Sequence, residues 1–380
     1  MTHQLKSAPR IADDNGQTSL DPGSQEAVMQ EKEQSHGIFL HTGWRSAGTW
    51  VWSRFRAFQT VTAFYEPLHP ILGDLREADI PALEPTWTSG HPTLTAPYFT
   101  EYRPFIQDNM HGVAGYRKSF GTDRFGPSAD AGFSALHAYL KNLHDQTTSE
   151  GKIPVFKFCR SLGRLPWFKS AFPQVMHAVV VRNPASQFAS GWLLHQQWNN
   201  PFFVAAPFRV LGLNQGEPIV KQVIEACGVR LPPVPVTSVD EYAAACEQYV
   251  RTVDGDNAYR AFMAMWILCA VRSLDQADLL VDLDRLGQSP AYASALRAQI
   301  QGQVAITPDF GGARDLVAQT KGNARLMKGI DGRSIKSTHA AALNFLVSQK
   351  GTSGPGAGIT AVVKEKLALA RELSEEWRYY

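Results

Sequence analysis

Short apolar runs separated by polar turns recur along the chain. Three of them are almost uninterrupted: GIFLH at 37–41, IPVFKFC at 153–159 and HAVVVR at 177–182. Runs of this length without polar alternation are typical of strands buried on both faces of a parallel sheet. AFYEPLHP at 63–70 predicts another short strand, ended by its prolines, and DLLVDLDRL at 278–286 predicts a fifth.

Helical patterns lie between these runs. TWVWSRFRAFQ follows the first strand, and FSALHAYLKNLHDQ covers 133–146. Asn183 and Pro184 begin a third helix, because Asn is a favoured N-cap and Pro a favoured first helical residue. Two or three further helices are expected between 217 and 274. Strands that alternate with helices predict an α/β fold with a central, mainly parallel sheet flanked by helices.

The chain divides into two regions by composition, and the second contains an insertion. Residues 1–35 are polar and rich in Gly, Ser, Gln and Asp, which predicts a flexible tail without the apolar core of a signal peptide. Residues 36–380 are expected to form a single domain. Within it, 71–150 is rich in Pro, Gly and aromatic residues, which predicts a large irregular insertion packed over a site.

Bulk properties narrow the function classes. A net charge of +2 argues against nucleic-acid binding but is compatible with a small anionic ligand. The longest apolar run, 261–271, is far shorter than the ~20 residues that span a bilayer, so a cytoplasmic protein is expected. The four cysteines form no ligand pattern, so no metal is expected, and Cys246 and Cys269 are predicted to be buried thiols.

The most informative segment is FLHTGWRSAGTWVW at 39–52. An apolar strand enters a turn of small residues with one cation, Arg45, and the turn begins a helix. Free backbone N–H groups and the helix dipole make such a helix start an anion site. Gly43 and Gly48 would let the backbone approach the anion. A strand-to-helix turn that binds nothing remains the alternative for this segment taken by itself.

A P-loop kinase is one alternative function. Gly43 and Gly48 have the spacing of the G-x-x-x-x-G-K-[ST] motif, but Thr49 stands where the phosphate-binding lysine is needed. ATP-dependent phosphoryl transfer is therefore disfavoured. A non-catalytic scaffold that binds a nucleotide is the second alternative.

A second anion motif lies in HAVVVRNPASQFAS, where Arg182 ends a strand and Ser190 follows eight residues later. With WRSAGTW, this segment resembles the sulfotransferases that use 3′-phosphoadenosine 5′-phosphosulfate (PAPS). WRSAGTW is similar to their 5′-phosphosulfate loop, and VVVRNPASQFAS to their 3′-phosphate motif. FYEPLH resembles a Y-E-P-L segment of Golgi-type carbohydrate sulfotransferases, and VFKFCRSLGR a K-x-x-R segment of bacterial members.

The resemblance implies a P-loop-type fold, PAPS as co-substrate and no metal. Arg45 would be the catalytic cation at the bridging oxygen. The resemblance also implies which residues bind PAPS: Arg45, Ser46, Ala47, Gly48 and Thr49 at the 5′-phosphate, Trp50 at the adenine, and Arg182 and Ser190 at the 3′-phosphate.

The acceptor side is less defined by the resemblance. Relatives with a histidine base carry it shortly after the strand lysine, but here Lys157-Phe158-Cys159-Arg160 contains none. Glu66 is the candidate general base, with a structural role in the loop as the alternative and His69 as the reserve base. Lys157 matches a lysine near the transferred group. Arg160 and Arg164 either line the site or pair with carboxylates.

The implied reaction is transfer of the sulfuryl group from PAPS to a hydroxyl acceptor. The Y-E-P-L resemblance suggests a carbohydrate or glycolipid as that acceptor. Aromatic residues of the insertion are expected to contact it: Tyr98, Phe99, Tyr102, Phe105 and Tyr116.

Overall fold

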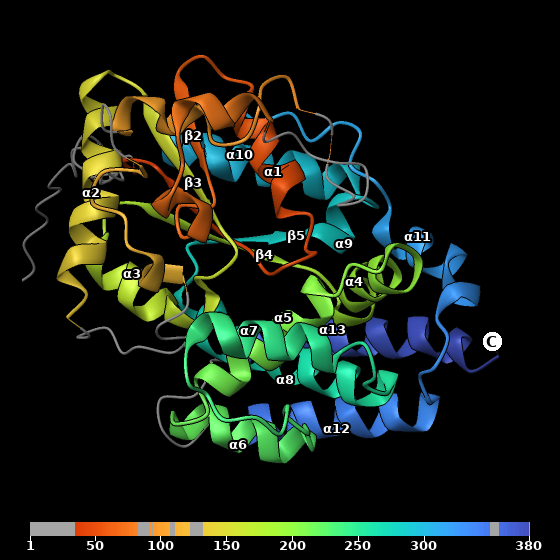
Figure 1. The fold of residues 1–380 in the computed structure, drawn as a ribbon. Coiled ribbons are helices and arrows are strands. Elements are labelled where there is room, and N and C mark those ends of the chain that lie inside the picture. Colours follow the sequence, from red (N-terminus) through yellow and green to blue (C-terminus); the bar gives the residue numbers. More distant parts are fainter. Residues whose placement is uncertain are drawn as a thin grey trace, which may run out of the picture. The chain divides into compact units, whose positions relative to one another are not determined.

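A five-stranded parallel sheet forms the centre of the computed structural model, which describes residues 35–82, 92, 94–106, 111–121, 132–349 and 357–379. Its strands are β1 (Ile38–His41), β2 (Val61–Tyr65), β3 (Ile153–Phe158), β4 (Met176–Val181) and β5 (Leu279–Asp282). They lie in the order β2-β3-β1-β4-β5, and each neighbouring pair is parallel (Figure 1). The predicted α/β fold with a central parallel sheet flanked by helices is confirmed.

Two strands differ from their predicted bounds. The strand expected at 63–70 ends at Tyr65, because Glu66 adopts a left-handed backbone conformation with φ 48°. The strand expected at 278–286 ends at Asp282, whose carboxylate accepts hydrogen bonds from the N–H groups of Asp284 and Arg285. That carboxylate caps α9 (Leu283–Leu286), so the second half of the predicted strand is helical.

The first hydrophobic core lies between the sheet and the helices beside it. These are α1 (Gly48–Arg56), α2 (Ser134–Ser149), α3 (Leu165–Ala171) and α10 (Pro290–Val304). Phe39 of β1 stacks on Phe156 of β3 with ring centroids 4.9 Å apart. β1 and β4 are buried along their whole length, which explains their uninterrupted apolar sequences.

A second core is formed mainly by helices, with Val181 from the end of β4. These helices are α4 (Pro184–Trp198), α5 (Phe202–Leu213), α6 (Pro218–Cys227), α7 (Val239–Tyr249), α8 (Gly255–Ser273), α11 (Leu316–Gly322), α12 (Gly332–Ser348) and α13 (Ala357–Glu375). α8 is buried on nearly every side, among helices that include α5, α6 and α12 (Figure 1). Cys246 is fully buried as predicted, whereas Cys269 is half-buried.

The predicted irregular insertion, 71–150, contains short 3-10 helices and α2 in its described parts. The 3-10 helices are Pro70–Gly73, Glu77–Ala82, Thr100–Phe105 and Lys118–Gly121. Tyr102 packs against Phe64 and donates a hydrogen bond to the Tyr65 carbonyl (3.1 Å), which fixes part of the insertion onto β2. The tail predicted at 1–35 lies outside the described residues apart from Ser35, and the single domain over 36–380 stays a prediction.

The strand order places a topological switch point at the carboxyl ends of β1 and β4. β1 leads through α1 to β2, beyond β3, whereas β4 leads to β5 at the opposite edge. α1 and α4 therefore leave the carboxyl ends of two adjacent strands in opposite directions. Ligands of open α/β sheets bind at such a switch point.

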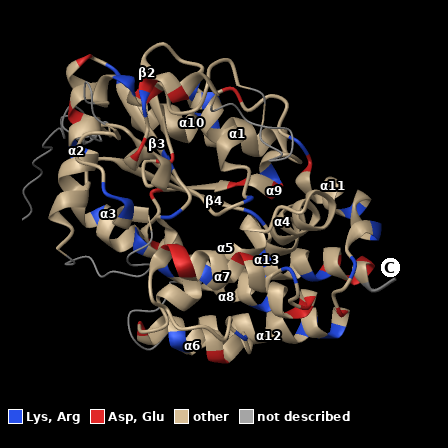
Figure 2. Ribbon diagram, in the orientation of Figure 1, with Lys and Arg blue, Asp and Glu red and all other residues tan. Residues whose placement is uncertain are grey.

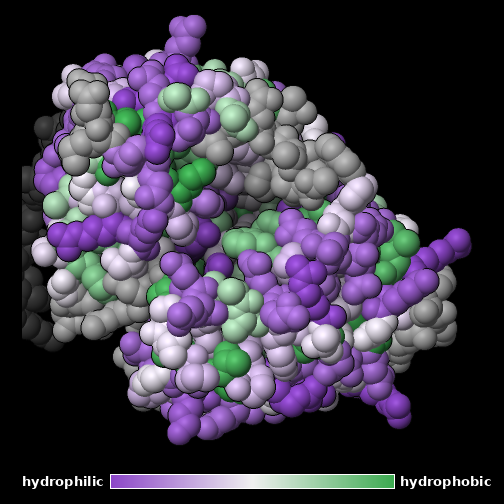
Figure 3. All heavy atoms as spheres, in the orientation of Figure 1, coloured by the Kyte–Doolittle hydropathy of each residue, from purple (hydrophilic) through white to green (hydrophobic). Residues whose placement is uncertain are grey.

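Over the described residues on the face shown in Figures 2 and 3, no charged or apolar patch singles out another site. Basic and acidic residues occur together on helices such as α6 and α13 (Figure 2). The visible, described surface is mostly hydrophilic, with apolar side chains in small groups (Figure 3).

Candidate functional site

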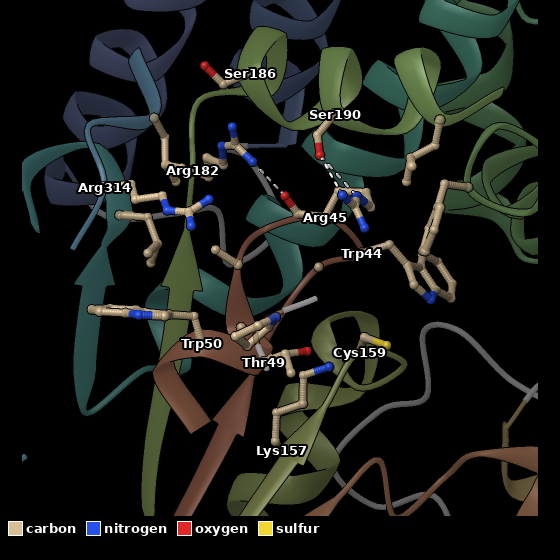
Figure 4. A pocket seen from close by; sticks show the side chains of 18 of the residues that line it. Trp44, Arg45, Thr49, Trp50, Lys157, Cys159, Arg182, Ser186, Ser190 and Arg314 are labelled. Carbon is tan, nitrogen blue, oxygen red and sulfur yellow. Dashed lines mark hydrogen bonds between the residues drawn. The ribbon is translucent and has the colours of Figure 1, made fainter. Parts of the chain in front are cut away.

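A cavity of about 820 Å³ lies at the carboxyl ends of the strands, within the size range of small-molecule sites. Its walls come from the turn after β1, the ends of β2 and β3, α4, the start of α5 and residues 312–323. The structure brings together most of the predicted site residues in its lining: Arg45, Ala47, Gly48, Thr49, Trp50, Glu66, His69, Lys157, Arg182 and Ser190. Figure 4 shows several of these side chains around the cavity.

The turn after β1 is held by its own side chains. The Thr42 hydroxyl donates to the Phe158 carbonyl (2.8 Å), and the Ser46 hydroxyl donates to the Gly43 carbonyl (2.7 Å). Ser46 is 1% exposed and is not among the described residues that line the cavity. Ser46, which was predicted to bind PAPS, therefore lies inside the turn.

The two glycines of the turn are needed for close packing within the protein. A Cβ on Gly43 would lie 2.6 Å from Nε2 of Gln187, and one on Gly48 would lie 2.5 Å from Cγ2 of Thr42. By contrast, Arg45 and Ala47 adopt positive φ angles of 63° and 57° although they have side chains. Residues held in this region cluster at functional sites.

The start of α1 is suited to an anion. Its N-cap is Ala47, and no described side chain accepts a hydrogen bond from the N–H groups of the first turn. Thr49 in that turn lines the cavity, with its hydroxyl 3.4 Å from the Tyr65 hydroxyl. Uncapped N–H groups at the positive end of the helix dipole leave donors for a ligand.

Arg182 is a buried cation at the end of β4. Its Nη1 donates a hydrogen bond to the Arg45 carbonyl oxygen (2.9 Å), and the side chain is 5% exposed. Its Nε has no hydrogen-bond partner among the described residues. Burial lowers the pKa of Arg182 to about 10, a shift that Asp284 partly opposes, so the guanidinium remains charged at neutral pH.

Arg45 and Ser190 bring the two anion motifs into direct contact. Nε and Nη2 of Arg45 donate to the Ser190 hydroxyl oxygen at 3.0 and 2.8 Å, as Figure 4 shows. The guanidinium also lies over the Phe203 ring, 4.8 Å from its centroid. Because Ser190 accepts these bonds through its oxygen, its own proton can be donated to a ligand. Burial lowers the pKa of Arg45 to about 10.

Residues from the end of the chain support the β4–α4 junction. Asn183 caps α4 by accepting from the Ser186 N–H (2.8 Å), and its own backbone and amide nitrogens donate to Asp284 at 2.8 and 2.7 Å. Lys366 of α13, 1% exposed, donates to Asp282 (2.6 Å) and Asp284 (2.8 Å). α13 therefore fixes the turn that follows Arg182.

Glu66 lies in a buried cluster of charges at the ends of β2 and β3. Its carboxylate accepts from Lys157, from the Cys159 N–H (3.2 Å) and, at 3.4 Å, from Nη1 of Arg160. Burial alone would raise the pKa of Glu66, but the charges of Lys157 and Arg160 outweigh it and lower the pKa to about 2. The ion pair in turn raises the pKa of Lys157 against the effect of burial.

His69 also lines the cavity, but its hydrogen bond restricts its chemistry. Its Nδ1 accepts from the Ile71 N–H (3.2 Å), so the proton of the neutral ring is on Nε2. Burial lowers the pKa of His69 to about 4, which keeps the ring neutral at pH 7. In this conformation neither nitrogen offers a free lone pair to a substrate.

The aromatic residues divide between the cavity and the core. Trp50 is half-buried in the cavity lining, with its ring 6.1 Å from that of Phe310. Tyr98 and Phe99 line the cavity, as expected of acceptor contacts. The other three residues predicted to contact the acceptor, Tyr102, Phe105 and Tyr116, lie outside the described lining, and the first two belong to the core.

Several lining residues were not predicted. Arg314, from the segment Gly-Gly-Ala-Arg, lies near Arg182 and Trp50 in Figure 4. Phe202 and Phe203 of α5 line the other side. Arg160, whose role the sequence left open, lines the cavity. Arg164 instead donates to the Phe120 carbonyl (2.6 Å) and is buried outside the lining.

Comparisons with known proteins give little beyond this geometry. No family model and no curated protein matches the sequence. A solved structure described as a sulfotransferase from Alicyclobacillus acidocaldarius is similar, with 13% identity and a TM-score of 0.31, over 80% of this chain and 95% of that chain. Shared architecture at this identity does not carry function from one protein to another.

Among the residues that the structure describes, no helix is long and apolar enough to cross a bilayer. Within the same residues, no group of three or more His, Cys, Asp or Glu side chains is arranged to hold a metal ion.

Proposed function

We propose that this protein is a sulfotransferase that transfers the sulfuryl group of PAPS to a hydroxyl acceptor. The observation that carries the proposal is the hydrogen bond from Arg182 to the Arg45 carbonyl (2.9 Å), which joins two cationic motifs at one cavity. PAPS has phosphate groups at both its 3′ and 5′ positions. A protein that binds it needs two adjacent sets of hydrogen-bond donors, because each anion requires its own charge-assisted hydrogen bonds.

The donor would lie along the α1 and α4 side of the cavity. Arg182 and the Ser190 hydroxyl would hold the 3′-phosphate, with Arg314 at the same end. The uncapped start of α1 and the Thr49 hydroxyl would bind the 5′-phosphate, and Trp50 would stack on the adenine. Arg45 would offset the charge that develops on the leaving oxygen.

The reaction breaks the bond between sulfur and the oxygen of the 5′-phosphate and forms a bond between sulfur and the acceptor oxygen. The products are the sulfate ester and adenosine 3′,5′-bisphosphate, and the hydroxyl proton must be removed. Catalysis would come from positioning and from charge stabilisation by Arg45 and Lys157.

Glu66 would take the acceptor proton once Lys157 turns from it toward the sulfuryl oxygens. In the resting site the carboxylate is a weak base, because two cations hold its pKa near 2. Without Lys157 beside it, the buried carboxylate would have less positive charge to offset the cost of burial. Its pKa would therefore rise. The base would therefore become active only beside the donor.

Ligand binding and turnover test the proposal together. Thermal shift and calorimetry with adenosine 3′,5′-bisphosphate should show binding without a metal, and labelled PAPS should transfer sulfate to members of a panel of sugars and phenols. Stabilisation by Mg·ATP and not by the bisphosphate would favour a P-loop kinase. Bisphosphate binding without transfer to any acceptor would favour a nucleotide-binding scaffold.

A further inference from the structure

Charge in the cavity lining is strongly unbalanced. The described lining has a single carboxylate, Glu66, but its cationic side chains are more numerous: Arg45, Arg54, Lys157, Arg160, Arg182 and Arg314. Helices away from the cavity, such as α6, carry both signs (Figure 2), so the imbalance is local. Arg45, Arg182 and Arg314 belong to the side of the proposed donor, as does Arg54, whose guanidinium lies over the Trp50 ring. Lys157, near the end of β3, and Arg160, just after that strand, remain to be explained.

Arg160 is only weakly neutralised. It is 7% exposed, and its Nη1 reaches Glu66 at 3.4 Å, whereas Lys157 pairs with the same carboxylate at closer range. Its Nε is buried without a hydrogen-bond partner among the described residues. The guanidinium lies over the Trp44 ring, 5.7 Å from its centroid. One carboxylate between two cations leaves a net positive charge.

Arg209 of α5 adds a second cation nearby. Its guanidinium lies over the ring of Phe202, a lining residue, at 5.2 Å, and its Nε has no partner within the described parts of the chain. Arg209 is not among the described residues that line the cavity, so it would act from behind the wall. Burial and, after it, the charge of Arg160 lower the pKa of Arg209 to about 10, and Glu247 partly opposes this shift. An anion bound beside Arg160 would offset part of the repulsion between the two guanidinium groups.

This cationic pair is at the acceptor end of the cavity. Figure 4 shows Trp44 and Cys159 on the opposite side of the cavity from Trp50 and Arg314, with Lys157 and Thr49 between the two sides. Arg160 follows Cys159 in the chain and packs on Trp44. Its guanidinium is thus beyond Lys157 when the cavity is followed from the adenine side.

We infer that the acceptor carries an anionic group beside its hydroxyl, a carboxylate, sulfate or phosphate ester, which Arg160 binds with Arg209 behind it. Trp44 and Phe202 would cover the apolar or ring portion of the same molecule. This inference rests on the proposed function, because it assumes that the other end of the cavity holds PAPS.

Matched acceptor pairs test it. With the full chain, kcat/KM for sulfate transfer from PAPS is compared for 4-hydroxyphenylacetate and 4-hydroxyphenylacetamide, and for glucuronate and glucuronamide. The anionic member of a pair should be preferred by about tenfold or more, the value of one charge-assisted contact. Calorimetry of the two phenols against the protein saturated with adenosine 3′,5′-bisphosphate gives the same comparison without turnover.

Variants assign the preference to the two arginines. Arg160→Gln and Arg209→Gln should bring the ratio within a pair close to one and leave the Kd for adenosine 3′,5′-bisphosphate within about twofold, a smaller change than loss of one contact. Arg160→Lys should keep part of the preference. Arg333→Gln, at a side chain that is 93% exposed, is the matched control and should change neither quantity.

Two outcomes would overturn the inferred anionic acceptor, and a third would overturn the proposed function. Equal kinetics and equal binding of the paired phenols in the wild type would overturn the inference. So would a loss of bisphosphate affinity in Arg160→Gln that leaves the acceptor ratio unchanged. A wild type that binds no adenosine 3′,5′-bisphosphate and transfers no sulfate would instead overturn the proposed function itself.

Discussion

Arg182 donates a hydrogen bond from its guanidinium to the backbone carbonyl of Arg45, a residue 137 positions earlier in the chain. The accepting residue has a positive φ of 63°, a conformation that is costly for a residue with a side chain. One side chain at the end of β4 thus braces the turn that follows β1, and the same guanidinium retains N–H groups for a ligand.

Replacing Arg182 by alanine should weaken binding of adenosine 3′,5′-bisphosphate by about 30- to 150-fold, or on the order of 2–3 kcal/mol, because a buried charge-assisted contact is lost. Calorimetric titration measures this change. The control is Arg333→Ala, at an exposed position. Unchanged affinity in a folded Arg182→Ala protein would contradict the assignment of Arg182.

Ser190→Ala removes the hydroxyl that accepts from Arg45 at 3.0 and 2.8 Å. We expect a loss of about 1–2 kcal/mol in bisphosphate binding, because both the ligand contact and the anchor of Arg45 disappear. Ser190→Thr keeps the hydroxyl and should retain most of the affinity. If the alanine variant bound as tightly as the threonine variant, Ser190 would have no part in ligand binding.

Glu66→Gln should destabilise the protein in a pH-dependent way. The pKa of Glu66 is lowered from 4.5 to about 2, so its ionised form stabilises the fold fully above pH 4.5, and this contribution is lost as the pH falls toward 2. At pH 7 we expect the variant to be less stable by about 3 kcal/mol. Urea unfolding between pH 7 and 2.5 should show the two proteins converging in acid, and a constant difference would refute this account.

Gly48→Ala tests the packing of the turn. The new Cβ would lie 2.5 Å from Cγ2 of Thr42, and we expect a loss of about 1–3 kcal/mol in the free energy of unfolding. Gly302→Ala is the matched control, because Gly302 lies in α10 with open space around it. That change should stabilise the helix by about 0.5–1 kcal/mol. Equal urea midpoints for the two variants would be inconsistent with the contact at Thr42.

Lys366→Met should destabilise the protein by about 3–5 kcal/mol, because Asp282 and Asp284 would lose the buried ammonium between them. Adding Asp284→Asn removes one of the uncompensated charges and should recover part of this loss. A single variant as stable as the wild type in urea unfolding would exclude a supporting role for α13.

Much of the fold was readable from local sequence. β1 and β4 are short apolar runs that are buried throughout, and β3 is buried except at its first residue; such runs have few other structures open to them. α5 was not predicted, since Pro207 in its middle is a signal against a helix. The end of β5 at Asp282 was also missed, because there a helix cap overrides an apolar pattern.

The site was predictable where its residues follow strand ends. Arg45 lies in the turn after β1, and Arg182 directly follows β4; the two strands are adjacent in the sheet. Contacts between distant residues were not predictable: Lys366 lies 82 residues from Asp284, and Glu66 lies 91 residues from Lys157. No local pattern encodes such a pairing, which is why Glu66 could be proposed as a base without its cationic neighbours being known.

The two ends of the cavity are built from different kinds of structure. Strand-to-helix junctions of the sheet form the end with Arg182 and Thr49, whereas Tyr98, Phe99, Phe202 and Phe203 come from the insertion and from the start of α5. In the proposed sulfotransferase, substitutions in 94–106 would therefore alter which acceptor is sulfated more than they alter the residues proposed to bind PAPS. Phe203 is different, because its ring packs on Arg45. An architecture of this kind would let acceptor selectivity diverge while the source of the transferred group stays the same.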